Sequence, residues 1–239
     1  MVCCTHRTVL GKLLSMQRRF DFEVDEFYHL YNRGTDKRKI FETPADYARF
    51  TALLYLCNSK VSIVFRDLSP KDFFSMDRGE TLVDIGVYCL MPNHFHILIR
   101  EKLENGTSAF MKKLLTSYSM YFNRKNNRTG GLFEGTYKAR HADTDRYLKY
   151  LFSYIHLNPA KRVDTNWKTN IHIDRKKILD YINRYPHSSF LDYKGVKRKE
   201  GAILNTSAFP DYFENTHDLE QSIADWLHYD DELPKDGPM

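Results

Sequence analysis

Two histidines stand two positions apart in the stretch LMPNHFHILIR, residues 90–100. An apolar run that follows a Met-Pro-Asn turn is typical of a strand. Side chains alternate along a strand, so His94 and His96 are expected on one face, about 7 Å apart, with Phe95 on the other. Two imidazoles placed in this way can bind one divalent metal ion. The alternative is a pair of polar side chains satisfied within the fold.

A metal site needs a further ligand, and residues 144–158 offer one. The sequence TDRYLKYLFSYIHLN predicts a helix that begins near Asp143 or Thr144 and is stopped by Pro159. Tyr154 and Asn158 lie four residues apart and therefore share a helix face. If that face meets the histidine strand, Asn158 offers an amide oxygen and Tyr154 a phenol. A residue before proline is pushed away from helical dihedrals, which sets Asn158 at the helix end.

A phenol beside a metal ion can attack a phosphodiester. Its ordinary pKa near 10 makes it a poor nucleophile, but a nearby metal and a polarised phosphorus remedy this. The resulting phosphotyrosine link conserves the bond energy, so strand transfer needs no nucleotide cofactor. The pattern alone does not rank Tyr154 above Tyr147 and Tyr150, whose default interpretation is core or surface packing. His156 is assigned no role.

The elements that must position these groups are strands and helices in an order that lacks the regular βαβ alternation of a parallel sheet. We expect a strand at 27–34, a helix from Pro44 with Thr43 as its cap, and two strands around the Met-Pro-Asn turn. A helix capped by Thr107 or Ser108 follows, then a Gly-rich basic loop, the helix at 144–158, and a C-terminal helix from Thr216 to about Tyr229. The natural solution is an α+β fold, an antiparallel sheet with helices on one face.

Composition points to a folded, mildly basic protein. The hydrophobic content of 42% allows a sizeable core, the net charge is +5, and no apolar run is long enough for a membrane helix. The four cysteines have no metal-ligand spacing and are interpreted as free thiols of a cytoplasmic protein. Basic clusters lie beside aromatic residues or Gly-rich turns, which suits a DNA backbone, although each could be a solvated face. The candidate DNA-binding residues are Arg33, Lys37, Arg38, Lys112, Lys113, Arg124, Lys138 and Arg140.

Several blocks together resemble the REP-associated tyrosine transposases, a group of the single-tyrosine HUH transposases. They are MPNHFHILIR and YLKYLFSYIHLNPAKRV, with FYHLYNRGTDKRKIF, GLFEGTYKARH and YPHSSFLDYKG in the same order. The resemblance covers roughly residues 26–195. Their joint occurrence is specific, whereas His-x-His alone is not.

The resemblance implies a ferredoxin-like HUH endonuclease fold over residues 21–195, between a flexible extension at 1–20 and a C-terminal extension at 196–239. It implies that His94, His96 and Asn158 bind Mg²⁺ or Mn²⁺ and that Tyr154 is the nucleophile; the donor set suits Mn²⁺ better. The implied reaction cleaves and rejoins single-stranded DNA near hairpins of REP-like palindromes through a 5′-phosphotyrosine. A homodimer is left open.

Two other functions are weighed against this one. The first is a catalytically silent protein that binds DNA hairpins at chromosomal repeats, which has no need for His94, His96, Tyr154 and Asn158 together. The second is a metal-dependent phosphodiesterase that uses water, with Tyr154 as a packing residue. A covalent protein–DNA adduct separates the transposase from both.

Overall fold

The computed structural model describes residues 21–61, 73–170, 172–213 and 215–228, so the predicted extension at 1–20 lies outside the described residues. The strands are β1 (Phe27–Arg33), β2 (Val83–Met91), β3 (His94–Glu101) and β4 (Lys138–His141). The helices are α1 (Pro44–Leu56), α2 (Gly106–Lys125), α3 (Asp145–Leu157), α4 (Ala160–Val163), α5 (Arg175–Ile182), α6 (Phe190–Tyr193) and α7 (Thr216–His228), with 3-10 turns η1 (Thr35–Lys37), η3 (Lys199–Ile203) and η4 (Thr206–Ala208).

The strands form one four-stranded sheet in the order β2-β3-β1-β4, and every neighbouring pair is antiparallel. Along the chain the elements run β1-α1-β2-β3-α2-β4, which is the ferredoxin-like succession. The predicted α+β class and ferredoxin-like sheet are therefore confirmed. Strand β3, which carries the histidine pair, lies in the interior of the sheet between β2 and β1.

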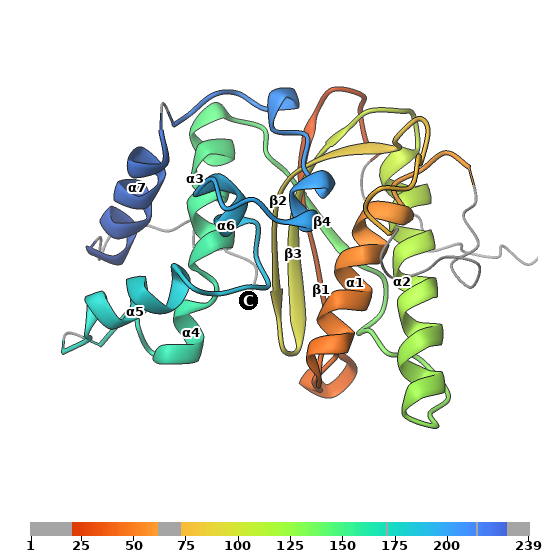
Figure 1. Cartoon of the computed structure of the whole chain (residues 1–239), viewed down its shortest axis with the longest axis horizontal. Helices are drawn as coiled ribbons and strands as arrows, with labels where there is room; N and C mark the ends of the chain where they lie inside the picture. Colours follow the sequence, from red (N-terminus) through yellow and green to blue (C-terminus); the bar gives the residue numbers. More distant parts are fainter. Residues whose placement is uncertain (1–20, 62–72, 171, 214, 229–239) are drawn as a thin grey trace, which may run out of the picture.

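Helices cover both faces of this sheet (Figure 1). On one face Phe95, Ile97 and Ile99 belong to the same hydrophobic core as α1 and α2. On the other face Leu98 shares a second core with Leu151 and Ile155 of α3. The expectation of helices on one face holds for α1 and α2 but is wrong for α3. An amphipathic sequence shows which side of a helix is buried, but not which face of a sheet it covers.

The turn before β3 is tied to the rest of the fold by its backbone. The amides of Ile40 and Phe41 donate to the carbonyl of Pro92, and the amide of Gly34 donates to the carbonyl of Asn93 at 2.9 Å. On the other flank, the Tyr185 hydroxyl donates to the carbonyl of Leu90 at 2.7 Å. The start of β3 is therefore held from both sides.

The cap predicted for α2 is wrong. The helix begins at Gly106, and its N-cap is Asn105, in a left-handed conformation with φ of 61°. Thr107 does not cap the helix because its amide and hydroxyl both donate to the buried carboxylate of Glu101. The last residue of β3 thus replaces the expected cap.

The chain after α6 returns to the sheet before it forms α7. The amide of Asn205 donates to the carbonyl of Ile85 at 2.9 Å. Phe209 lies against Gly86, where an added Cβ would come within 2.7 Å of the Phe209 ring. Helix α7 closely matches the predicted C-terminal helix, while the domain boundary at residue 195 stays a prediction. Within the described segments, no helix has the length and apolar character needed to cross a membrane.

Asp46 joins α1 to α2. Its carboxylate is buried and accepts hydrogen bonds from the amides of Glu42 and Thr43, each at 2.9 Å. It also accepts from the Tyr121 hydroxyl and from the ammonium of Lys125, which lies 2.7 Å away. Burial alone would raise the pKa of Asp46, but the hydrogen bond from Lys125 and those from the two amides lower it below its ordinary value.

We expect Asp46→Asn to destabilise the fold by about 2 kcal/mol at pH 7, since hydrogen bonds to a charged group are lost. Because the folded-state pKa lies below the unfolded value of about 3.9, this stabilisation is present above that pH and fades as the pH falls further. Urea unfolding at pH 7 and at pH 3 measures both effects. Asp36→Asn is the control, because the Asp36 side chain is 83% exposed. Equal midpoints for the Asp46 variant and the parent protein at pH 7 would contradict the prediction.

Candidate functional site

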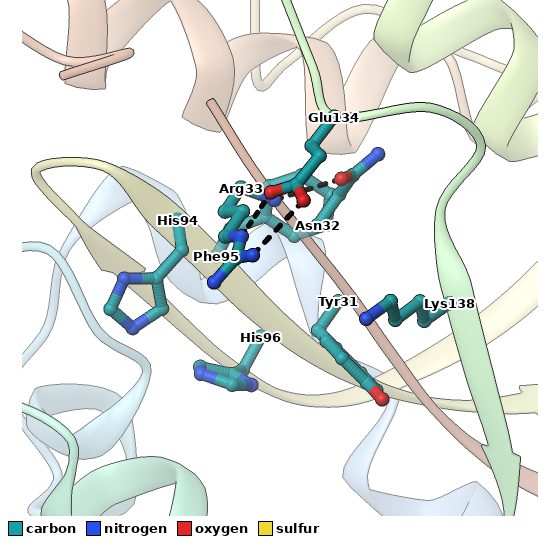
Figure 2. A pocket seen from close by; sticks show the side chains of 8 residues that line it. All are labelled: Tyr31, Asn32, Arg33, His94, Phe95, His96, Glu134 and Lys138. Atoms are coloured by element: carbon teal, nitrogen blue, oxygen red, sulfur yellow. Dashed lines mark hydrogen bonds and ion pairs between the residues drawn. The ribbon is translucent and has the colours of Figure 1, made fainter. Parts of the chain in front are cut away.

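The two histidines of β3 project from the same side of the sheet (Figure 2). Their ring centroids lie 5.1 Å apart, and the rings are nearly perpendicular. His94 pairs with Arg33 and His96 with Tyr31 across the β1–β3 ladder. The strand alternation expected from the sequence therefore brings both imidazoles to one place.

A neighbouring amide fixes the tautomer of His94. Its Nδ1 lies 2.7 Å from Oδ1 of Asn93, whose own Nδ2 donates to the carbonyl of Lys37 at 3.4 Å. Because that amide is oriented by Lys37, the His94 Nδ1–H is the donor and Nε2 keeps its lone pair. Nε2 is buried and has no hydrogen-bond partner among the described residues.

A third histidine, which the sequence analysis did not single out, orients His96. His29 of β1 is fully buried, and its Nε2 lies 3.0 Å from Nδ1 of His96. The outer nitrogen of His96, Nε2, is buried without a described partner, as it is in His94. Ligating histidines commonly use their second ring nitrogen for such an orienting hydrogen bond.

The environment keeps all three rings neutral. Burial lowers the pKa of His94 to about 4, with the charges of Lys161 and Arg33 acting in the same direction and the Asn158 side chain opposing them. Burial lowers the pKa of His29 to about 3, helped by the charge of Arg140. The pKa of His96 is also well below its usual value, again mainly through burial. Neutral imidazole is the form that binds a metal ion.

Helix α3 brings Tyr154 to this cluster. The helix starts at Thr144, whose hydroxyl accepts from the amide of Tyr147. The Tyr154 ring centroid lies 5.8 Å from that of His96 and 5.9 Å from that of His29. Burial raises the pKa of Tyr154 well above its ordinary value. The phenol is therefore protonated at neutral pH.

The other two candidate tyrosines, Tyr150 and Tyr147, lie successively closer to the N-terminus of α3. The Tyr150 ring contacts Tyr154 at 5.5 Å and stands edge-on to Trp226 of α7 at 4.8 Å. Tyr147 contacts Tyr150 and lies under the guanidinium of Arg140. Of the three, Tyr154 is the one whose ring contacts the histidines.

Asn158 stays helical, contrary to the expectation from Pro159. Its φ and ψ are −52° and −37°. Pro159 has no amide to donate to the carbonyl of Ile155, so the Asn158 amide donates there instead, at 3.4 Å. The Asn158 side chain then donates through Nδ2 to the carbonyl of Tyr154 at 3.0 Å. This bond fixes the orientation of the side-chain amide and leaves Oδ1 buried without a described partner.

These residues fit a divalent metal ion. Nine buried side-chain atoms in the described part of the chain lack a hydrogen-bond partner, and they include Nε2 of His94, Nε2 of His96 and Oδ1 of Asn158. Nε2 of His94 and Oδ1 of Asn158 carry lone pairs, and Nε2 of His96 carries one in the tautomer in which its Nδ1–H donates to His29. No described group of three His, Cys, Asp or Glu side chains could hold a metal. The candidate set is therefore two imidazoles and one amide.

A basic and aromatic surface borders the histidines on the β1 and β4 side. Tyr31, Arg33 and Lys138 line a pocket with His94 and His96 (Figure 2). Arg140 pairs with His29 in the β1–β4 ladder and shares that face of the sheet. The Arg33 guanidinium is paired with the exposed carboxylate of Glu134.

The remaining predicted DNA-binding residues are not gathered at the histidines. Lys37 and Arg38 follow β1 near the Asn93 turn, and Arg38 is paired with Asp36 at 3.6 Å. Lys112, Lys113 and Arg124 lie on α2, which covers the other face of the sheet. The Lys113 ammonium donates to the carbonyls of Ser59 and Val61. Their roles in DNA binding stay predictions.

Residues 70–158 match the family model described as "Transposase IS200 like". This segment contains both histidines of β3, Tyr154 and Asn158. Over these residues the chain is similar to the IS200-like transposases. The match confirms the resemblance to a transposase family that the sequence motifs indicated.

Among solved structures, the chain is similar to the "Structure of the REP associates tyrosine transposase bound to a REP hairpin". The two share 14% identity with a TM-score of 0.46, over 84% of this chain and 100% of the other. No curated protein matches the sequence significantly.

The sequence did not reveal four residues around the candidate site: His29, Asn93, Glu134 and Lys161. The signal for His29 was present, because the alternation of β1 places it on the face of Tyr31 and Arg33. Asn93 was taken only as turn chemistry. Lys161 follows Asn158 by three residues, and its charge acts on both His94 and His96.

We expect His94 to carry its proton on Nδ1 at pH 7.5, because Asn93 Oδ1 accepts from that nitrogen. Two-bond ¹⁵N–¹H correlation spectra of the imidazole measure the tautomer directly. Asn93→Ala should remove this preference and shift the ring toward the Nε2–H form. A spectrum that shows His94 as the Nε2–H tautomer in the parent protein would contradict the assignment.

Proposed function

We propose that this protein is a transposase of the IS200-like family that cleaves and rejoins single-stranded DNA through Tyr154. The observation that carries the proposal is the contact of the Tyr154 ring with His96, whose Nε2 is buried without a described partner. A buried phenol beside partnerless ligand atoms suits attack on a metal-bound phosphodiester.

The proposed reaction balances without a further reactant. The Tyr154 oxygen attacks the scissile phosphorus, a P–O bond forms to the phenol, and the bond from phosphorus to the 3′ oxygen breaks. The departing oxygen takes the electron pair and gains a proton, while the phenol loses one. The products are a 5′-phosphotyrosine and a free 3′-OH, and a second 3′-OH reverses the step to rejoin strands.

His94, His96 and Asn158 would hold the divalent metal ion. Mg²⁺ or Mn²⁺ there would neutralise charge on the scissile phosphate and polarise its phosphorus. The chain itself keeps the ligands neutral by burial, fixes the His94 tautomer through Asn93, and excludes water around the phenol. Two imidazoles and one amide oxygen favour Mn²⁺ over Mg²⁺.

The DNA strand would approach over Tyr31, Arg33, Lys138 and Arg140. These basic and aromatic side chains share the histidine face of the sheet, and they suit a phosphate backbone with unstacked bases. Hairpin-forming palindromes as the substrate follow from the sequence resemblance, and a cytoplasmic location follows from the interpretation of the cysteines as free thiols. The homodimer remains open.

We expect Tyr154→Phe to abolish the covalent adduct with a labelled single-stranded hairpin oligonucleotide in Mn²⁺, because the attacking oxygen is lost. Hairpin binding should persist. A denaturing gel measures the adduct, and a filter assay measures binding. Tyr147→Phe is the matched control on the same helix, and it should retain the adduct.

An adduct that survives in Tyr154→Phe would refute Tyr154 as the nucleophile. Hairpin binding by the parent protein with no adduct in any metal would favour the non-catalytic hairpin-binding protein. Cleavage without an adduct would favour a phosphodiesterase that uses water.

We expect the protein alone to bind one Mn²⁺ per chain in calorimetry. Asn158→Ala should weaken Mn²⁺ binding by about 10–100-fold, because one ligand is lost and the two histidines remain. This is the loss of affinity seen when a group that supports a metal site is removed. His96→Ala should abolish detectable binding. His156→Ala tests a buried histidine outside the site and should leave Mn²⁺ affinity unchanged. Equal affinity in the parent protein and in His96→Ala would rule out the metal site.

A further inference from the structure

A second pocket is lined by Tyr154 and shares no lining residue with the pocket that holds the histidines. Tyr150, Tyr154, Asn158, Lys161, Trp167 and Lys168 line it. We call this the lysine–tryptophan pocket. Its walls come from α3, from α4 and the segment after it, and from Trp226 of α7, which lies beside α3 (Figure 1). Tyr154, Asn158 and Lys161 belong to the site described above, whereas Trp167 and Lys168 do not.

The two lysines of this pocket are not neutralised. Neither Lys161 nor Lys168 forms an ion pair with an acidic side chain in the described part of the chain. The Lys168 ammonium lies 5.6 Å from the centroid of the Trp167 ring. Lys161 is half-buried and Lys168 is exposed, and partial burial together with the charge of Lys161 lowers the pKa of Lys168. Adjacent cations without a counter-charge are unfavourable until an anion joins them.

The pocket also contains a hydroxyl that lacks an acceptor. The Tyr150 side chain is buried, and its oxygen has no hydrogen-bond partner among the described residues. Indole and phenol rings, including the buried Trp167, form the remaining wall. Cationic groups, a hydroxyl donor and aromatic faces are the combination that binds a nucleotide of a single strand.

We propose that the lysine–tryptophan pocket binds the nucleotide next to the scissile phosphate, with its phosphodiester on Lys161 and Lys168. This inference rests on the proposed function. The histidines line one pocket with Arg33 and Lys138, Tyr154 lines the other, and the His96 and Tyr154 rings lie 5.8 Å apart. A strand bound at the site would therefore have a flanking nucleotide in each pocket. The Tyr150 hydroxyl donates to the bound nucleotide, and Trp167 contacts its apolar part.

Binding tests the pocket without any need for cleavage. The probe is a labelled DNA hairpin with single-stranded flanks, bound to Tyr154→Phe protein over a range of salt concentrations. Each phosphate contact on a single strand contributes about 0.7 to the slope of log affinity against log salt. Adding Lys161→Gln and Lys168→Gln together should reduce the slope by about 0.7, because both lysines bind the same phosphodiester. Adding Lys176→Gln, an exposed lysine of α5, serves as the matched control.

A neutral phosphate identifies the contact on the DNA. The wild-type adduct first maps the scissile position. A methylphosphonate is then placed at the first phosphate on its 5′ side or on its 3′ side. At one of these two positions it should weaken binding by about fivefold at 0.1 M salt. That penalty should disappear in the double-lysine variant and persist in Lys176→Gln. The melting temperature of the double variant should not fall, because its lysines have no counter-charge in the described fold.

Each outcome has one meaning. A slope unchanged in the double variant, or a methylphosphonate penalty that survives there, overturns the pocket while the proposed function stands. A slope that also falls in Lys176→Gln assigns the effect to general surface charge and overturns it as well. Absence of hairpin binding by Tyr154→Phe and wild-type protein alike refutes the proposed function and the pocket with it.

Discussion

The site depends on buried polar atoms that the chain leaves unsatisfied. A buried donor or acceptor without a partner costs about 1–3 kcal/mol, and His94, His96 and Asn158 each contribute one. The hydrogen bonds of these side chains are made by their inner atoms, toward Asn93, His29 and the last turn of α3. The outer atoms are thereby fixed in direction. The core around β3 must be stable enough to carry them, and its two packed faces supply that stability.

The sequence predicted β3 and its histidines well because strand alternation is a local property. Two apolar neighbours and a Pro-Asn turn were enough to place both imidazoles on one face. The helix bearing Tyr154 was equally local, because its apolar spacing and Thr144 cap lie within a few residues. The same logic failed at α2, where Glu101 of another element takes the hydroxyl and amide of Thr107.

The meeting of separate elements could not be predicted from the sequence. The rank of Tyr154 over Tyr147 and Tyr150 depends on the side of the sheet that α3 covers, which no periodicity encodes. His29 lies 67 residues from His96. Basic residues show the same limit: Lys138 and Arg140 reach the histidine face, whereas Lys112 and Lys113 lie on α2. Asn158 lies at the helix end as predicted, but its helical dihedrals were not foreseen, because its backbone amide donates to the Ile155 carbonyl that Pro159 cannot reach with an amide of its own.

The placement of the proposed ligands on both β3 and α3 would have a mechanical consequence. A metal ion held by His94, His96 and Asn158 would act as a cross-link between a central strand and a helix that follows much later in the chain. Tyr154 lies one turn before Asn158 on that same helix, so tension on the link would reposition the phenol and the ligand together. The affinity for the ion and the alignment of the attacking oxygen would then change together whenever α3 shifts against the sheet.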